Sequence, residues 1–120
     1  MDDRRNQLEE IIYDARNELS DIKLKEKLEL NKQLVGKCFK YHNCYSCPKS
    51  EEDYWWVYRF ITHIDENGSL WGIEFEEDKY HKLTIETKTM IVSNEGWKQI
   101  SKKVFLLAWD EMIEKIKRLN

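Results

Sequence analysis

The chain has 120 residues and a formal net charge of −3, and it is rich in aromatic residues, with five Trp and six Tyr against a single Pro. This length supports one hydrophobic core, and the composition excludes a disordered linker or tail. No stretch of about 18 consecutive apolar residues is present, which excludes a transmembrane helix.

The N-terminal residues lack the apolar core of a secretion signal. The three cysteines, an odd number, are more typical of a reducing compartment than of a disulfide framework. We therefore expect an intracellular protein with no membrane contact.

Charge is unevenly distributed along the chain. Residues 34–97 carry a net charge of −4, whereas residues 98–120 carry +3. Affinity for nucleic-acid phosphates comes from Lys and Arg side chains that displace counterions. The acidic central part therefore predicts no direct binding of nucleic acid and favours a partner protein with a basic surface.

Residues 1–33 are predicted to form a helix with an apolar stripe at coiled-coil spacing. The stripe consists of Leu8, Ile12, Ala15, Leu19 and Ile22. Glu26 and Glu29 stand where it would continue, and Ser20-Asp21 is placed to cap a second helical segment. Two interpretations are open: the stripe packs on the rest of the chain, or it pairs with a second copy in a short coiled coil and gives a homodimer.

Five strands are expected where β-branched and aromatic residues alternate with polar ones. Their expected ranges are 34–41, 54–65, 69–75, 82–92 and 97–100. Asn67 and Gly68 are expected to supply two positive φ angles in a tight turn between the second and third strands. Ser101 is expected to cap a final amphipathic helix.

Alternation along the second strand assigns its side chains to two faces. One face is predicted to hold Trp55, Val57, Arg59, Ile61 and His63, and the other to hold Tyr54, Trp56, Tyr58, Phe60, Thr62 and Ile64. On the following strand, Trp71, Ile73 and Phe75 are expected to face inward and Leu70 outward.

The order of elements predicts an α+β fold in a single domain, residues 1–120. A helical segment (1–33) precedes a small five-stranded antiparallel SH3-like curled barrel (34–100), and a C-terminal helix (101–120) follows it.

An acidic edge is the first candidate site. Carboxylates cluster where the chain enters and leaves the central hairpin, namely Glu51, Glu52, Asp53, Glu74, Glu76, Glu77 and Asp78. They either keep the protein soluble or form a surface that imitates nucleic-acid phosphate and binds a basic partner. Trp56 or Tyr58 is expected to anchor that contact.

A metal site is the second candidate. Cys44 and Cys47 form a CxxC pair that His42 and Cys38 could complete as four zinc ligands. All four fall within ten residues, whereas zinc ligands usually come as two separated pairs, so the stronger interpretation is a buried Cys38 and two loop thiols. We predict no cofactor.

An aromatic cage for a methylated Lys or Arg is the third candidate. It would draw on Tyr41, Tyr45, Tyr54, Trp56, Tyr58, Trp71 and Tyr80, although packing is the stronger interpretation of these residues. For catalysis, the histidines His42, His63 and His81 show no triad or metal spacing, and no Gly-rich phosphate loop is present. The chain is therefore predicted not to be an enzyme.

A resemblance covers roughly residues 34 to 78. It rests on three runs, Leu34-Val35-Gly36-Lys37-Cys38-Phe39-Lys40-Tyr41, Tyr45-Ser46-Cys47-Pro48-Lys49-Ser50 and Asp53-Tyr54-Trp55-Trp56-Val57-Tyr58, together with Gly68-Ser69-Leu70-Trp71-Gly72-Ile73-Glu74-Phe75. These runs resemble small uncharacterised proteins encoded by phages and prophages of low-GC Gram-positive bacteria.

The resemblance implies an accessory phage protein in the cytoplasm of a bacterial host. Anti-CRISPR and other anti-defence inhibitors are similar in size and charge. The expected function is therefore a non-enzymatic inhibitor that occupies the basic groove of a host defence complex. The alternative is an SH3-like regulatory module that is associated with nucleic acid or supported by zinc.

Overall fold

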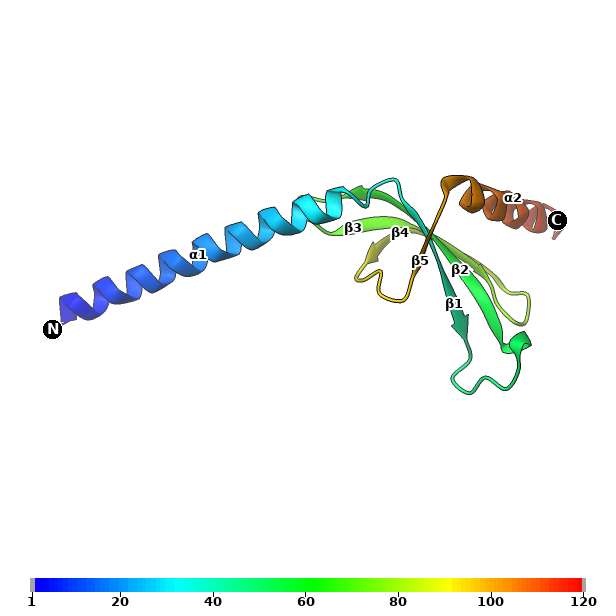
Figure 1. The fold of residues 1–120 in the computed structure, drawn as a ribbon, viewed down its shortest axis with the longest axis horizontal. Helices are drawn as coiled ribbons and strands as arrows, with labels where there is room; N and C mark the ends of the chain where they lie inside the picture. The colour runs from blue at the N-terminus through cyan, green and yellow to red at the C-terminus, as the bar shows by residue number, and fades with distance from the viewer. Residues whose placement is uncertain (1, 120) are drawn as a thin grey trace.

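The computed structural model describes residues 2–119 of the chain (Figure 1). Its elements are α1 (Asp2–Lys32), β1 (Cys38–Cys44), the 3-10 helix η1 (Glu51–Asp53), β2 (Tyr54–Ile64), β3 (Leu70–Glu77), β4 (Leu83–Ile91), β5 (Lys98–Ile100) and α2 (Lys102–Arg118). The predicted α+β class is confirmed. Within residues 2–119, neither helix has an apolar stretch long enough to cross a bilayer.

The five strands form one antiparallel sheet in the order β4-β3-β2-β1-β5. β4 and β5 are opposite edges, so the sheet is open and the predicted SH3-like barrel is not confirmed. β5 has only three residues, and α2 covers one face of the sheet in place of further strands (Figure 1). A helix that buries the apolar face removes the need for the sheet to close on itself.

The core between α2 and the sheet is built from aromatic and sulfur-containing side chains. Phe105 and Met112 of α2 are buried, together with Cys38 and Phe75 of the sheet. The ring of Phe75 lies edge-on to Phe105 at 5.3 Å between centroids. Burial of a large apolar side chain such as Phe or Met contributes about 1.5–3 kcal/mol, so the packing of α2 on this face stabilises the domain substantially.

The opposite face of the sheet has a second, smaller core. It consists of Phe39, Ile61, Leu70 and Ile91, and Leu34, Val35, Ile64 and Trp97 pack around it. The segment 34–37, predicted to begin the first strand, is instead a turn and linker that lies over this core. It is tied down by Gly36 N, which donates to Ile61 O at 2.8 Å, and by Ile61 N, which donates to Lys37 O at 3.0 Å.

A β-bulge in β2 corrects the predicted assignment of faces. Ile61 pairs with Gly72 and His63 with Trp71, which leaves Thr62 as an extra residue. One extra residue reverses the alternation beyond it. Ile64 therefore joins the face of Ile61, and His63 stacks on Trp71 on the other face. Leu70 lies on the face opposite Phe75, as the alternation of β3 predicts, but it is buried because that face has the second core.

The β2–β3 turn differs from its prediction in one angle. Only Gly68 has positive φ (77°), and Asn67 does not. Asp65 supplies the missing constraint, because its Oδ1 accepts from the backbone N of Asn67 and of Ser69, both at 2.9 Å. Its Oδ2 accepts from Trp71 Nε1 at 2.8 Å. The hydrogen bonds from Trp71 and then Ser69 lower the pKa of the Asp65 carboxyl.

Helix α1 projects away from the sheet (Figure 1). Its 31 residues span about 46 Å, and the molecule measures 75 × 32 × 25 Å. The predicted break at Ser20-Asp21 is wrong, because one helix runs through these residues. The predicted packing of the stripe on the rest of the chain is also wrong, since Leu8, Ile12, Leu19 and Ile22 are 51–52% exposed. Only the end of α1 touches the sheet, where Asn31 Nδ2 donates to Gly68 O at 2.7 Å.

Candidate partner-binding groove

Several predicted acidic contact residues are neutralised within the chain. Asp53 is buried and contacts Lys79 Nζ, and its Oδ2 also accepts from Lys49 N at 2.7 Å and from Ser50 N at 3.2 Å. The Lys79 hydrogen bond is the main reason why the pKa of the Asp53 carboxyl is lowered. This aspartate holds the β1–β2 connection in place and is not available to a partner.

Glu74 is likewise engaged. Its Oε1 accepts from Arg59 Nε at 2.7 Å, and both side chains are nearly buried. The same guanidinium donates to Ser93 O at 2.8 Å and stacks on the ring of Trp97 at 3.8 Å from its centroid. Sequence reasoning missed this network, although an isolated Arg in an apolar strand was a signal for a buried ion pair.

The remaining carboxylates have mixed roles. Glu76 accepts from Trp55 Nε1 at 3.0 Å, and Asp78 Oδ1 accepts from the backbone N of Tyr80 and of Lys82 in the β3–β4 turn. Glu51 and Glu52 of η1 are exposed. Of the seven predicted carboxylates, Asp53, Glu74 and Glu77 are thus paired with cations, and Glu76 and Asp78 are hydrogen-bonded within the chain.

Four of the nine predicted partner-binding residues do come together. Trp56 and Tyr58 of β2 and Glu76 and Glu77 of β3 line a groove of about 190 Å³, and α2 forms the other wall. From α2 the lining residues are Ala108, Glu111, Met112 and Lys115.

Two aromatic side chains of the groove differ in exposure: Tyr58 is packed against the core, and Trp56 is accessible at the edge of the groove. Tyr58 stacks on Phe75 with ring centroids 5.1 Å apart. Trp56 is 39% exposed, and its ring stacks on His42 with centroids 4.4 Å apart. Lys40 Nζ lies 4.1 Å from the centroid of the Trp56 ring, so this ring already makes one cation–π contact within the chain.

The groove has an excess of negative charge. Glu77 and Glu111 line the groove with one lysine, Lys115, which contacts Glu77 Oε2, whereas the carboxylate of Glu76 accepts from Trp55 on the opposite face of the sheet. His81 Nδ1 lies 2.9 Å from Glu77 Oε1. Hydrogen bonds from Lys115 and then His81 lower the pKa of the Glu77 carboxyl. Because Lys115 forms an ion pair with Glu77, Glu111 is the carboxylate best placed to bind a cation of another molecule.

Glu111 was not predicted from the sequence, where it belongs to the polar side of an amphipathic helix. Its proximity to Tyr58 has an electrostatic consequence. Burial raises the pKa of the Tyr58 hydroxyl, and the charge of Glu111 raises it further. The spacing of Glu111 and Lys115, one helical turn apart, was the only sequence signal that both could face the same element.

The predicted aromatic cage is not assembled. Tyr41 packs on Trp97, Tyr45 packs on Trp55 and Tyr80, and Trp71 stacks on His63. These contacts lie at different places on the sheet. Tyr54 and Trp56 lie near each other, since both rings pack on His42, but the Tyr45–Tyr80 pair is formed by other rings.

The four candidate zinc ligands are also kept apart. Within residues 2–119, no three side chains of His, Cys, Asp or Glu are grouped as metal ligands. Cys38 lies in the core beneath α2, and burial raises the pKa of its thiol, which disfavours the thiolate that zinc requires. Cys44 is half-buried and Cys47 is exposed in the connection that follows β1.

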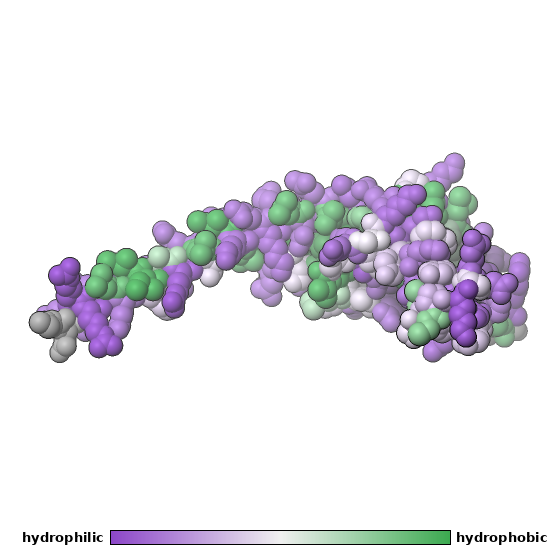
Figure 2. All heavy atoms as spheres, turned by 60° about the horizontal axis from the view of Figure 1, so that its bottom comes forward, coloured by the Kyte–Doolittle hydropathy of each residue, from purple (hydrophilic) through white to green (hydrophobic). Residues whose placement is uncertain are grey.

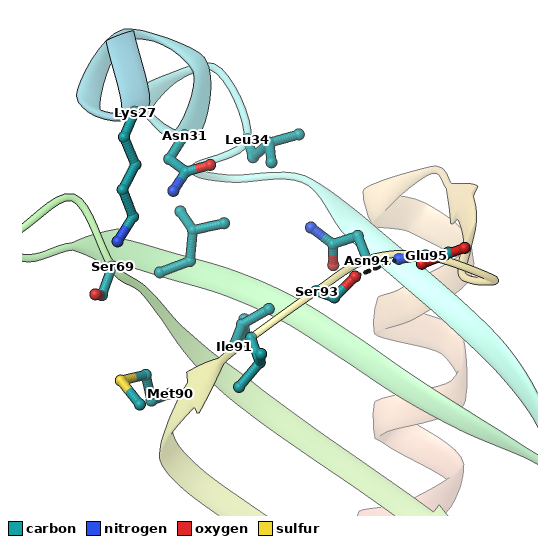
Figure 3. Close-up of a pocket in the computed structure, with 11 residues that line it drawn as sticks. Lys27, Asn31, Leu34, Ser69, Met90, Ile91, Ser93, Asn94 and Glu95 are labelled. Carbon is teal, nitrogen blue, oxygen red and sulfur yellow. Dashed lines mark hydrogen bonds between the residues drawn. The ribbon is translucent and has the colours of Figure 1, made fainter. Parts of the chain in front are cut away.

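A larger groove of about 480 Å³ lies where α1 meets the sheet (Figure 3). Lys27 and Asn31 of α1 form one side, and Ser69, Met90 and Ser93 lie opposite. Ser93 Oγ accepts from Glu95 N at 3.0 Å, and Asn31 bonds the β2–β3 turn. These two polar side chains of the groove are thus hydrogen-bonded to backbone groups of the chain itself. We interpret this groove as the joint that orients α1.

Comparison of the chain with protein-family models, curated proteins and solved structures finds no match.

Proposed function

We propose that this chain is a non-enzymatic protein-interaction module that holds a cationic segment of a partner protein in the groove between α2 and the β2–β3 hairpin. The observation that carries the proposal is that the rings of Trp56 and Tyr58 line one groove with the carboxylates of Glu77 and Glu111, of which Lys115 pairs only with Glu77. Aromatic rings and carboxylates together favour Lys or Arg side chains.

The positions of the histidines support a binding role over a catalytic one. His42 stacks on Trp56, His63 stacks on Trp71, and His81 contacts Glu77. Each imidazole is already in contact with a neighbouring side chain. A general base has to reach its substrate and a nucleophile together.

For the biological setting we propose a phage protein that inhibits a nucleic-acid-binding defence complex of its host. This part rests on the sequence resemblance and on the complementarity between the groove and a basic protein surface. The contact would be smaller than the acidic edge that the sequence suggests, because Asp53, Glu74 and Asp78 are engaged within the chain.

The test is a charge reversal on α2 with a matched control. Glu111→Lys changes the groove, whereas Glu114→Lys makes the same change at an exposed pair with Lys117, outside the groove. Both variants are titrated with a short oligolysine peptide, and binding is followed by the Trp56 indole signal in NMR spectra. We expect Glu111→Lys to weaken binding about fivefold, equivalent to roughly 1 kcal/mol for an exposed ion pair, and Glu114→Lys to leave it unchanged.

Two outcomes would overturn the proposal. One is an unperturbed Trp56 indole signal during the oligolysine titration, and the other is equal weakening by both variants, which would indicate a non-specific charge effect. Binding of DNA or RNA with a steep salt dependence would instead support the regulatory-module alternative.

A further inference from the structure

The exposed stripe of α1 is an apolar feature without a partner among the described residues, and it is separate from the groove. We call Leu8, Ile12, Ala15, Leu19 and Ile22 the seam. Figure 2 shows apolar side chains in patches along α1, separated by hydrophilic ones. Half-exposed Leu and Ile side chains at coiled-coil spacing cost free energy in water unless another surface covers them.

The seam is free to be covered without disturbing the joint with the sheet. In heptad notation, with Ile12 and Leu19 at position a, the seam occupies positions a and d. The residues of α1 that lie at the β2–β3 turn are Lys27, Leu28 and Asn31, which are positions b, c and f on the outer side. A second helix can therefore lie along the seam while each sheet keeps its own contact.

We propose that the occupant is a second copy of this chain, paired through α1 as a parallel two-stranded coiled coil. The seam begins and ends with a d position, and this pattern supports the parallel arrangement. Its layers follow the order d-a-d-a-d, and in a parallel pair each layer meets its own copy. In an antiparallel pair each a position meets a d position, so one end of the seam would face a charged residue: Ile22 would meet Arg5, or Leu8 would meet Glu26.

The flanking charges also fit a parallel pair. In this arrangement, position g of one heptad lies beside position e of the partner helix's next heptad. Arg4 then faces Glu9 of the second copy, and Glu18 faces its Lys23. The other two such positions combine a charged with an apolar residue, Ile11 with Arg16 and Lys25 with Leu30. No like charges meet among these flanking positions, whereas Arg5, at position a before the seam, would meet its own copy and marks the N-terminal end of the pairing.

Glu9 also has a partner within its own chain, since Arg5 Nε lies 3.4 Å from its Oε1. Arg5 and Arg4 are neighbours, so Glu9 can contact both cations in a dimer. The Glu18–Lys23 contact is the one that adds most to the pairing, because both residues flank the middle and end of the seam.

Glu26 and Glu29 define where the pairing ends. They occupy positions a and d beyond Ile22, so in a parallel dimer each would meet its own copy and repel it. The helices therefore separate after the seam and lead to two sheets at the same end. The paired part spans about 21 Å from Leu8 to Ile22, which is short, so the dimer is expected to depend on concentration.

Sedimentation of the full chain over a range of concentrations tests the pairing. We expect the parent to dimerise, Leu19→Glu to remain monomeric, and Tyr13→Glu to behave as the parent. Tyr13 is an exposed residue at position b of the same helix, so this control places a carboxylate outside the seam. A parent that stays monomeric at its highest soluble concentration would overturn the proposal, as would dimers of Leu19→Glu as strong as those of the parent.

A charge swap tests the orientation. Glu18→Lys should weaken the dimer about fivefold or more, because two attractive contacts become repulsive, and Glu18→Lys combined with Lys23→Glu should restore it. Glu10→Lys, at outer position f, serves as control, and circular dichroism confirms that helix content is kept. If Glu18→Lys leaves the dimer unchanged while Leu19→Glu abolishes it, the parallel arrangement is wrong.

Discussion

The two helices of this protein have similar apolar spacing and opposite structural roles. Phe105 and Met112 of α2 are buried against the sheet. Among the described side chains of α1, by contrast, none is buried and only Leu28 and Asn31 are half-buried. The α2 stripe contains large aromatic residues that fill the surface over Phe75. The α1 stripe is narrower, contains Ala15 at its centre and is interrupted by Glu26.

The connections of the two helices explain this difference. α2 follows β5 after a single residue, Ser101, so the chain turns directly onto the adjacent face of the sheet. The linker after α1 instead uses Leu34 and Val35 to cover the opposite face. That face is small, and the linker and Trp97 take the place that a packed α1 would need. An amphipathic pattern therefore predicts that the apolar face of a helix will be covered. It does not predict whether the covering surface belongs to the same chain.

The largest expected effect separates the two helices directly. Phe105→Ala removes a ring from the core beneath α2 and is expected to lower the free energy of unfolding by about 3–5 kcal/mol. Leu19→Ala in α1 should change it by less than about 0.5 kcal/mol at protein concentrations where the chain is monomeric. Urea denaturation followed by tryptophan fluorescence measures both; equal losses would mean that α1 packs on the domain in solution.

The next effect compares a buried ion pair with an exposed one. Arg59→Met leaves Glu74 unpaired in a nearly buried position and is expected to cost about 3 kcal/mol. Arg5→Met removes the exposed pair with Glu9 in α1 and should cost at most about 0.5 kcal/mol. Thermal unfolding of the two variants checks this contrast, and a small loss for Arg59→Met would show that water reaches Glu74.

A pair of serine substitutions compares a helix end with a helix interior. Ser101 Oγ accepts from Val104 N at 3.2 Å, so Ser101→Ala should cost about 1 kcal/mol through the lost cap of α2. Ser20 lies inside α1, where Ala is the better helix former, so Ser20→Ala should slightly raise helix content. Urea denaturation reports the first effect and circular dichroism the second. A loss of helix for Ser20→Ala would indicate a break in α1.

The smallest effect concerns acid and the link between α2 and the sheet. The Glu77 carboxyl has a pKa below its ordinary value of 4.5, mainly because of Lys115. Its stabilising contribution is therefore complete above that pH and is lost as the pH falls through the lowered pKa. Because Lys115 is itself exposed, we expect only about 0.5 kcal/mol. Glu77→Gln should show a shallower loss of stability in acid than the parent, and identical pH profiles would contradict this role.

Much of the fold could be predicted from local patterns. Strand and helix positions, the α2 cap at Ser101 and the turn at Gly68 all follow from residue type and spacing, because backbone preferences act over a few residues. The open sheet could not be predicted in this way. Whether the edge strands β4 and β5 meet depends on the lengths of the strands and on the packing of α2. Both are set by contacts between segments that lie far apart in the sequence.

The candidate site shows the same division. Aromatic and acidic residues near the central hairpin were recognisable in the sequence, and Trp56, Tyr58, Glu76 and Glu77 do share a groove. The sequence could not show that Asp53 and Glu74 are bound by Lys79 and Arg59, or that Glu111 joins the groove from α2. Charge pairing depends on distances of a few ångströms, and packing between distant segments sets those distances. By itself, the sequence determined which surfaces are apolar or charged, and only the tertiary structure decided which of them remain exposed.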